Sequence, residues 1–188
     1  SAGGGCRGDA GGGGRRPAHG QSAGQRGPER RCGAVAVGRR LGQLGVNQDM
    51  APDADVVRTT TGVIGDRSVG PDPTLDARDV VAAVTGLQQG GVLATLKHWP
   101  GHGSTSTDSH IALAVIRKSA AQWKAVDRPP FQAGAVVAAS VLVGHLALPA
   151  LDPRGAPATR APRTRASARR RTPGQAGLVS GGCGPPGH

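Results

Sequence analysis

Aromatic residues are scarce in this sequence, whose 188 residues include no tyrosine, one phenylalanine and two tryptophans. Proteins that bind single-stranded nucleic acid stack bases on aromatic side chains, so few such positions are available here. No apolar run approaches the roughly 18 to 20 residues that cross a membrane. The sequence therefore predicts no membrane span and argues against nucleic acid as a partner, despite a formal net charge of +11.

Acidic residues are nearly absent from the two ends of the chain. The residues before 46 and after 153 carry 15 of the 23 lysines and arginines, but only Asp9 and Glu29 of the 12 acidic residues. Residues 46–153 contain 8 basic and 10 acidic residues, the balance of an ordinary globular domain. The basic charge therefore belongs to the ends.

The ends also lack the apolar periodicity of helices and strands. Stretches such as SAGGGCRGDAGGGGRRPAHGQ (1–21) and RAPRTRASARRRTPGQ (160–175) cannot bury enough apolar surface to offset the entropy lost on ordering. We therefore expect low-complexity basic tails at 1–44 and 154–188, and a domain between them at 45–153. The tails are interpreted either as disordered arms that contact RNA or lipids, or as GC-rich coding sequence read out of frame.

The middle of the chain alternates between strand and helix patterns. The expected strands are GVNQDMAP (45–52), VLATL (92–96) and VLVGH (141–145); the expected helices are 72–91, 120–126 and 131–140. Asp72 or Thr74 can cap the first helix, and Gly90-Gly91 ends it. This order predicts a parallel α/β fold.

Polar side chains follow the expected strands at the point where each strand ends. Asp53 and Asp55 follow the first strand, Lys97 and His98 the second, and His145 the third. In parallel α/β folds, functional residues gather at the carboxyl ends of the strands, so we expect a site there. The alternative is that polar residues simply end strands.

The loop KHWPGHGSTSTDSH (97–110) contains three of the six histidines. Metal binding is disfavoured, because Trp-Pro-Gly breaks any helix between His98 and His102 and because Lys97 repels a cation. Phosphate binding is disfavoured because the loop lacks the G-x-x-x-x-G-K-[ST] spacing. A loop held by turns, with incidental histidines, stays open.

Acid–base catalysis fits this loop better. Asp108 lies two residues before His110, so its carboxylate can accept a hydrogen bond from one ring nitrogen and raise the proton affinity of the other. Such a histidine can protonate a leaving oxygen and later accept a proton from water. Lys97 and His98 are donors suited to the hydroxyls of a sugar.

The same loop resembles a known family. VLATLKHWPGHGSTSTDSHIALAVI (92–116) is similar to the K-H-F-P-G-H-G-x-T-x-x-D-S-H signature of glycoside hydrolase family 3, in its bacterial β-N-acetylglucosaminidase (β-N-acetylhexosaminidase) branch. GVNQDMAPDADV (45–56) resembles the family's G-[IV]-N-x-x-x-A-P-V-x-D-V, and VIGDRSVGPDP (63–73) resembles I-G-x-R-[SA]-F-G. Trp99 and Val69 replace phenylalanines of these motifs. The resemblance covers residues 45–153.

The resemblance implies part of a (β/α)8 TIM barrel, about half of one, with the Gly/Arg/Pro-rich tails outside it. It implies a retaining hydrolase that removes terminal β-linked N-acetylglucosamine from cell-wall muropeptides or related glycoconjugates, a role in peptidoglycan turnover. Matched residue by residue, His110 is the general acid/base and Asp108 its partner, while Lys97, His98 and Arg67 hold the sugar. No cofactor or metal is implied.

Two family features have no match here. The D-x-E-G-G-x-V-x-R segment is absent from residues 1–44, and the nucleophilic aspartate is absent because the last acidic residue is Asp152. Retaining hydrolysis needs that carboxylate, so we expect an inactive, poorly folded fragment. The alternatives are a sugar-binding pseudo-enzyme and, more weakly, a basic nucleic-acid-binding protein. We expect a bacterial protein whose true N-terminus is missing, which leaves its location, cytoplasmic or exported, and its oligomeric state open.

Overall fold

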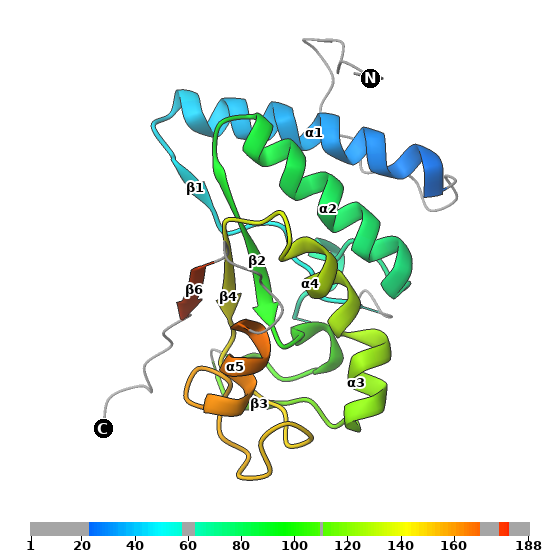
Figure 1. The fold of residues 1–188 in the computed structure, drawn as a ribbon, viewed down its shortest axis with the longest axis vertical. Coiled ribbons are helices and arrows are strands. Elements are labelled where there is room, and N and C mark those ends of the chain that lie inside the picture. Colours follow the sequence, from blue (N-terminus) through cyan, green and yellow to red (C-terminus); the bar gives the residue numbers. More distant parts are fainter. Residues whose placement is uncertain (1–22, 58–62, 110, 170–176, 181–188) are drawn as a thin grey trace.

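The computed structural model describes residues 23–57, 63–109, 111–169 and 177–180 (Figure 1). In chain order the elements are α1 (Ala23–Gln43), β1 (Gln48–Asp49), the 3-10 turn η1 (Gly65–Arg67), α2 (Pro73–Gln89), β2 (Leu93–Trp99), the 3-10 turn η2 (His102–Ser104), β3 (Ala114–Val115), α3 (Ala120–Val126), α4 (Arg128–Gly134), β4 (Ser140–Val143), β5 (Leu146–Ala147), α5 (Pro162–Arg169) and β6 (Gly177–Ser180). Within the described ranges, no helix combines the length and the apolar character needed to cross a membrane.

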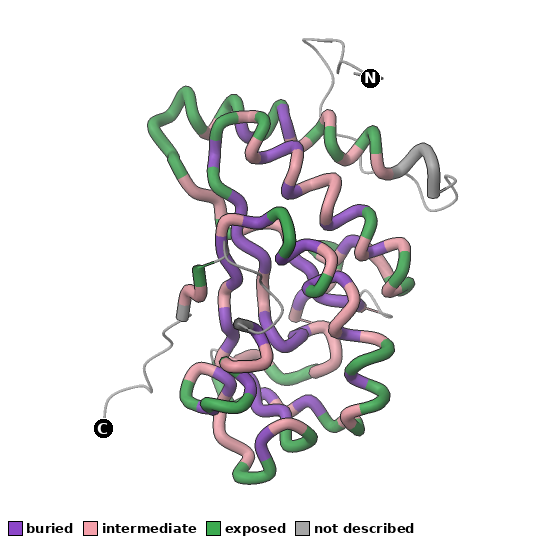
Figure 2. The backbone as a smooth tube through the Cα atoms, in the orientation of Figure 1, coloured by how far each residue is buried: buried purple, intermediate pink, exposed green. Residues whose placement is uncertain are grey.

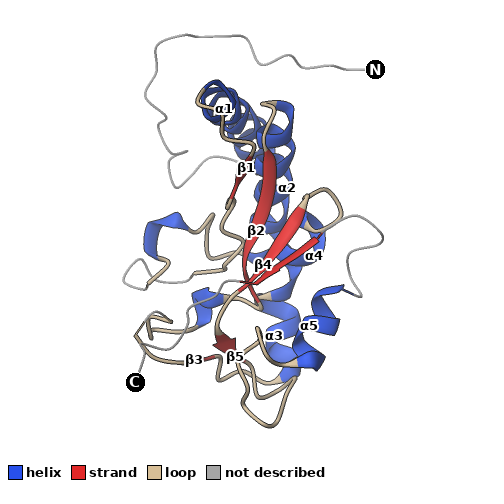
Figure 3. Cartoon of the chain, turned by 90° about the vertical axis from the view of Figure 1, so that its left-hand side faces the viewer, coloured by secondary structure: helices blue, strands red, loops and turns tan. Residues whose placement is uncertain are grey.

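Strands β1, β2, β4 and β6 form a sheet in that order, and each neighbouring pair is parallel (Figure 3). Strands β3 and β5 form a second, two-stranded parallel pair. Helices α2, α3 and α4 lie between successive strands along the chain, as parallel connections require. This confirms the α/β class predicted from the strand and helix patterns.

Helix α2 has the boundaries that its sequence predicts. Asp72 caps it by accepting hydrogen bonds from the backbone N–H groups of Thr74 and Leu75, at 2.8 and 3.2 Å. Gly90 is the C-cap, and Gly91 follows with φ of +98°, a conformation that favours glycine. Caps at both ends therefore limit this helix to the stretch between β1 and β2.

The core lies between the sheet and the helices α2 and α4. It includes Val80 and Val84 of α2, Leu96 of β2, Phe131 of α4 and Val141 of β4, each at most 2% exposed. Figure 2 shows these buried stretches along the central strands and the inner sides of the helices.

Three aromatic rings pack α3 and α4 against the end of β2. Trp99 makes edge-to-face contacts with Trp123 and Phe131, with ring centroids 5.5 and 5.4 Å apart. The indole N–H of Trp123 also donates to the carbonyl of Pro100 at 2.9 Å. The two tryptophans and the one phenylalanine of the sequence are thus all concentrated next to the loop that follows β2.

The helix expected over residues 131–140 is wrong in its extent. Helix α4 begins earlier, with the two prolines at its first turn, and ends at Gly134. A side chain at 134 would meet Val80 and Leu96, because an added Cβ would lie 2.7 and 2.9 Å from their methyl groups. The small residue lets α4 approach the core closely, and the chain then turns into β4.

The structure differs from the expected disorder over residues 23–43, which form α1 and pack along α2 (Figure 1). The contact is made through glycine: an added Cβ at Gly86 would lie only 2.3 Å from the carbonyl oxygen of Arg31. Arg30 Nε also lies 2.8 Å from a carboxylate oxygen of Asp79. Because small residues make this contact, α1 shows no apolar stripe from which it could be predicted.

Ordered elements also occur after residue 153, where a tail was expected. Helix α5 covers Pro162–Arg169, and β6 pairs in parallel with β4 from Gly177 to Ser180. The tail residues 1–22, 170–176 and 181–188 lie outside the described part of the chain.

Candidate active site

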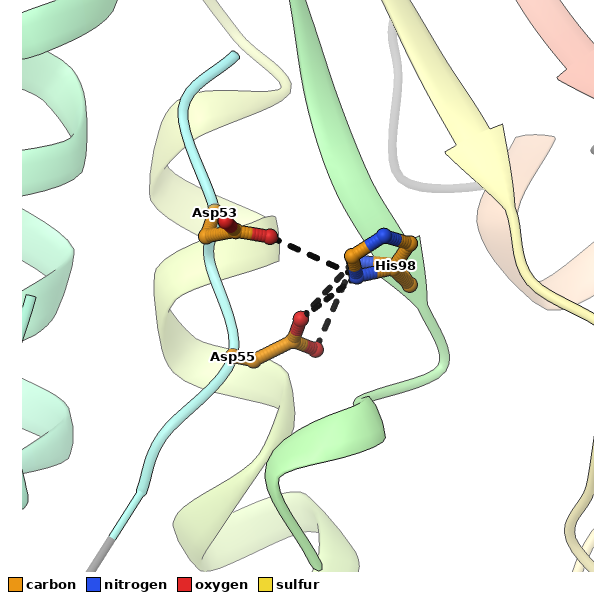
Figure 4. Close-up of side chains that lie close together, drawn as sticks. All are labelled: Asp53, Asp55 and His98. Carbon is orange, nitrogen blue, oxygen red and sulfur yellow. Dashed lines mark hydrogen bonds and ion pairs between the residues drawn. The ribbon is translucent and has the colours of Figure 1, made fainter. Parts of the chain in front are cut away.

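The segment after β1 continues alongside β2 and brings two carboxylates to the end of that strand. The backbone N–H of Ala54 donates to the carbonyl of Lys97 at 2.7 Å, and Asp53 bridges to Lys97 in parallel. Asp53 and Asp55 therefore lie beside His98 at the carboxyl end of β2 (Figure 4). The convergence expected from the polar strand ends is present here.

Asp55 is fully buried and holds the start of the loop after β2. Its carboxylate accepts a hydrogen bond from Nδ1 of His98 at 2.8 Å and another from the backbone N–H of His102 at 2.6 Å. A carboxylate only accepts hydrogen bonds, so this contact fits the tautomer of His98 that has its ring proton on Nδ1. In the neutral form of that tautomer, Nε2 is an acceptor for a ligand.

Asp53 is the point on which the expected sugar-holding residues converge. It is 7% exposed, with Oδ1 3.4 Å from Nδ1 of His98 and Oδ2 3.9 Å from Arg67 Nη1. Burial and the charge of Asp55 raise the pKa of Asp53, while Lys97, His98 and Arg67 act to lower it. The structure thus places Arg67, Lys97 and His98 around one carboxylate.

His102 is a buried member of the loop that the sequence alone did not single out as functional. Its Nε2 lies 3.1 Å from the hydroxyl of Ser109, and its Nδ1 lies 3.2 Å from the hydroxyl of Thr105. Burial lowers the pKa of His102, and the nearby charges of Asp55 and Asp108 oppose that shift. A neutral His102 therefore connects the start of the loop to its Asp108–Ser109 end.

Of the two expected acid–base residues, the structure describes Asp108 but not His110. Asp108 lies in the described loop, where its carbonyl accepts hydrogen bonds from the N–H groups of Ile111 and Ala112 at 3.0 and 3.1 Å. His110 lies outside the described residues. The pairing of Asp108 with His110 therefore stays a prediction from the sequence.

A second buried group, the Asp127 cluster (Ser104, Lys118 and Asp127), fastens the middle of the loop. Lys118 Nζ lies 2.7 Å from Asp127 Oδ2 and 2.5 Å from the hydroxyl of Ser104, which in turn donates to Asp127 Oδ1. Burial raises the pKa of Asp127, and its bonds to Lys118 and Ser104 oppose the rise. Sequence reasoning missed this cluster because the three residues are spread over 24 positions.

Gly101 allows the loop to approach the Asp127 cluster. Its φ is +125°, and an added Cβ would lie 2.9 Å from Cβ of Asp127. Both the conformation and the close approach require glycine here. His145, at the end of β4, pairs instead with the hydroxyl of Thr159 at 3.0 Å.

One group in the described part of the chain has the ligand atoms of a metal site. These are carboxylate oxygens of Asp53 and Asp55 and a ring nitrogen of His98, all within 4.8 Å of one another. As the structure shows them, Asp55 and His98 are joined by a hydrogen bond, so the group also serves to orient the imidazole.

Comparison with known proteins identifies relatives of this arrangement. A family model described as the glycosyl hydrolase family 3 N-terminal domain matches residues 28–179, a range that begins inside α1 and ends in β6. Beta-hexosaminidase from Stenotrophomonas maltophilia (strain K279a) is 36% identical over 120 residues, which make up 63% of this chain and 35% of that protein. Beta-hexosaminidase LpqI from Mycobacterium tuberculosis (strain ATCC 25618 / H37Rv) is 40% identical over 116 residues, or 61% and 30%.

A solved structure shares the fold. The glycoside hydrolase family 3 beta-N-acetylglucosaminidase from Paenibacillus sp. str. FPU-7 matches with a TM-score of 0.75 and 33% identity, over 85% of this chain and 30% of that one. The chain therefore spans about a third of the length of each of these three proteins.

Proposed function

Because the chain belongs to glycosyl hydrolase family 3 through its N-terminal domain, we propose that it holds terminal β-linked N-acetylglucosamine at the end of β2. One observation carries the proposal: Arg67, Lys97 and His98 converge around Asp53, beside the loop that contains Asp108. The relatives named beta-hexosaminidase and beta-N-acetylglucosaminidase agree with this class of sugar. We propose that this N-acetylglucosamine is the terminal sugar of cell-wall muropeptides or related glycoconjugates.

The three sugar-holding residues offer complementary hydrogen-bonding groups. Lys97 and Arg67 donate, whereas the Nε2 of His98 accepts while Nδ1 is bound to Asp55. The side chains of His98 and Arg67 are 19% and 47% exposed, so both retain surface that a ligand can contact. A sugar hydroxyl can therefore donate to His98 and accept from a cation at the same time.

His110 is proposed as the general acid/base. It would protonate the glycosidic oxygen as the bond to the sugar breaks, and Asp108 would stabilise the imidazolium before this transfer. Both residues belong to the loop that Asp55 holds at His102 and that the Asp127 cluster holds at Ser104. Anchoring the loop twice limits how far Asp108 can move relative to His98.

A retaining glycosidase also needs a carboxylate nucleophile. In these 188 residues the last acidic residue is Asp152, and its carboxylate is bound to Arg154 at 2.9 and 2.8 Å. We therefore propose that these residues supply the sugar-holding and acid/base part of the reaction. The same observation favours a second candidate function, sugar binding without hydrolysis.

Calorimetric titration of the 188-residue chain with N-acetylglucosamine tests the proposal. We expect saturable heat from the wild type, an at least tenfold weaker affinity in Lys97→Met, and an unchanged affinity in Lys124→Met, which removes an exposed lysine of α3. No saturable heat from a folded wild type, or equal affinities in all three proteins, would contradict it.

A further inference from the structure

Asp53 stands where the family motif has another residue. In G-[IV]-N-x-x-x-A-P-V-x-D-V, to which residues 45–56 are similar, the position of Asp53 is a valine and that of Asp55 is the motif aspartate. A valine there supplies no charge and no ligand atom. This chain therefore has a second carboxylate, two residues from the first, on a segment that is almost fully buried.

One oxygen of this extra carboxylate lacks a hydrogen-bond donor. Oδ1 of Asp53 is buried and accepts no hydrogen bond, and it points toward the ring of His98 (Figure 4). Arg67 approaches the other oxygen, Oδ2, and only to 3.9 Å. A buried carboxylate oxygen without a donor is unfavourable, and the neighbouring charge of Asp55 adds repulsion.

The distances around this oxygen suit a cation with a small coordination sphere. Zinc binds histidine nitrogen and carboxylate oxygen at about 2.0–2.2 Å, and in a tetrahedron this places the ligand atoms about 3.3–3.6 Å apart. Oδ1 of Asp53 lies 3.4 Å from Nδ1 of His98. The 2.8 Å hydrogen bond between Nδ1 and Asp55 Oδ2 needs to open by roughly half an ångström to reach the same spacing.

We propose that Asp53, Asp55 and His98 form a binding site for a zinc-like divalent cation. One imidazole and two carboxylates match zinc, whereas magnesium and calcium prefer oxygen ligands in larger shells. The cation replaces the hydrogen at Nδ1, so the ring proton moves to Nε2 and no net proton is lost from the imidazole. Binding therefore changes His98 Nε2 from an acceptor into a donor.

The cation site shares His98 and Asp53 with the proposed sugar site, but each proposal has its own test. The cation is proposed to use the Nδ1 side of His98 and Asp53, whereas the sugar is proposed to contact Nε2. A failure of the chain to bind N-acetylglucosamine leaves the cation proposal intact, and absence of zinc binding leaves the sugar proposal intact.

The test uses the 188-residue chain, freed of metal with a chelator and labelled with 15N-histidine, and zinc chloride as the probe. Nitrogen-detected spectra follow each imidazole, and His98→Gln assigns the resonance of His98. We expect zinc to shift the Nδ1 resonance of His98, and the wild type to bind one equivalent more than Asp53→Val. Other histidines and the cysteines bind equally in both proteins, so the difference isolates this site.

Two further variants separate ligand loss from misfolding. Asp53→Asn keeps the shape of the side chain and should also lose the additional equivalent, whereas Asp66→Asn removes an exposed carboxylate from a neighbouring segment and should retain it. Without zinc, Asp53→Val should melt no lower than the wild type. Equal zinc uptake by wild type and Asp53→Val, or a His98 ring unaffected by zinc, would overturn the proposal.

Discussion

Removing Lys118 should destabilise the chain strongly, because it leaves the carboxylate of Asp127 buried without its cation. Asp127 is fully buried, and its ion pair with Lys118 is 2.7 Å long. Deleting one partner of a buried ion pair costs roughly 3–5 kcal/mol. The hydroxyl of Ser104 stays bound to Asp127 in the variant, so we expect Lys118→Met to lose about 3 kcal/mol of unfolding free energy at pH 7.

The loss of unfolding free energy in Lys118→Met should be smaller at acidic pH, because proton binding to Asp127 is linked to folding. Burial raises the pKa of Asp127 above its ordinary value, so the folded state binds more protons than the unfolded state between the two pKa values. Stability therefore falls as pH rises through that window. Removal of Lys118 raises the pKa of Asp127 in the folded state further, so this pH window extends to higher pH in the variant. Between the folded-state pKa of Asp127 in the wild type and that in Lys118→Met, acidification reduces the stability difference between the two proteins by about 1.4 kcal/mol per pH unit.

Urea unfolding at pH 7 and at about pH 5 measures both effects, with Lys124→Met as the exposed control, expected to stay within about 0.5 kcal/mol of the wild type. Asp127→Asn should destabilise the wild type but stabilise Lys118→Met, because it removes the uncompensated charge. If Asp127→Asn deepens the loss in the Lys118→Met background, or if Lys118→Met costs no more than Lys124→Met, the reasoning about the buried charge is wrong.

Three other predictions follow from the fold and the site. Gly86→Ala, in α2, should lower stability by about 1–3 kcal/mol and speed amide hydrogen exchange in α1, because the added Cβ would meet Arg31 of α1. Gly33→Ala, at a position of α1 with open space around it, should gain about 0.5–1 kcal/mol, and equal effects of the two substitutions would refute the close α1–α2 contact. Asp72→Ala should cost about 1 kcal/mol in thermal unfolding through the lost α2 cap, and an unchanged melting curve would show that the cap contributes nothing. The 188-residue chain should release no nitrophenol from 4-nitrophenyl N-acetyl-β-D-glucosaminide, and turnover abolished by His110→Ala would show that it contains a working nucleophile.

The central part of the fold could be predicted because its signals are local. Asp72 and Gly90-Gly91 mark the ends of α2 within one stretch of sequence, and the apolar run before Lys97 marks β2. The polar residues after the first two strands predicted where those strand ends meet, whereas His145, after the third, pairs with Thr159. Parallel strands place those ends together whatever the details of packing.

Helix α1 could not be predicted because its stability depends on its partner. Its buried positions include Val35 and Gly38, and its contacts with α2 are formed where glycines let the two backbones approach. Such a surface contains too little apolar periodicity to indicate a helix. The arginine at position 30 reads as tail charge in the sequence, whereas in the structure it binds Asp79.

The site could be predicted only in part, because some of its residues adjoin strand ends and others are brought together by tertiary contacts. Asp53, Asp55 and His98 adjoin strand ends, so their proximity follows from topology. The Asp127 cluster depends on tertiary contacts between the loop after β2 and the junction of α3 with α4. The burial of His102 likewise depends on Asp55, Thr105 and Ser109 folding around it.

The most direct test of the central claim is a map of amide chemical shifts as N-acetylglucosamine is added to the isotope-labelled 188-residue chain. The account predicts saturable shifts concentrated at residues 53–55, at Arg67 and at Lys97–His98, with the amides of α1 and α5 unaffected. Saturable shifts confined to other surfaces, with Lys97 and His98 unchanged at saturation, would contradict the assignment of the sugar site to the end of β2.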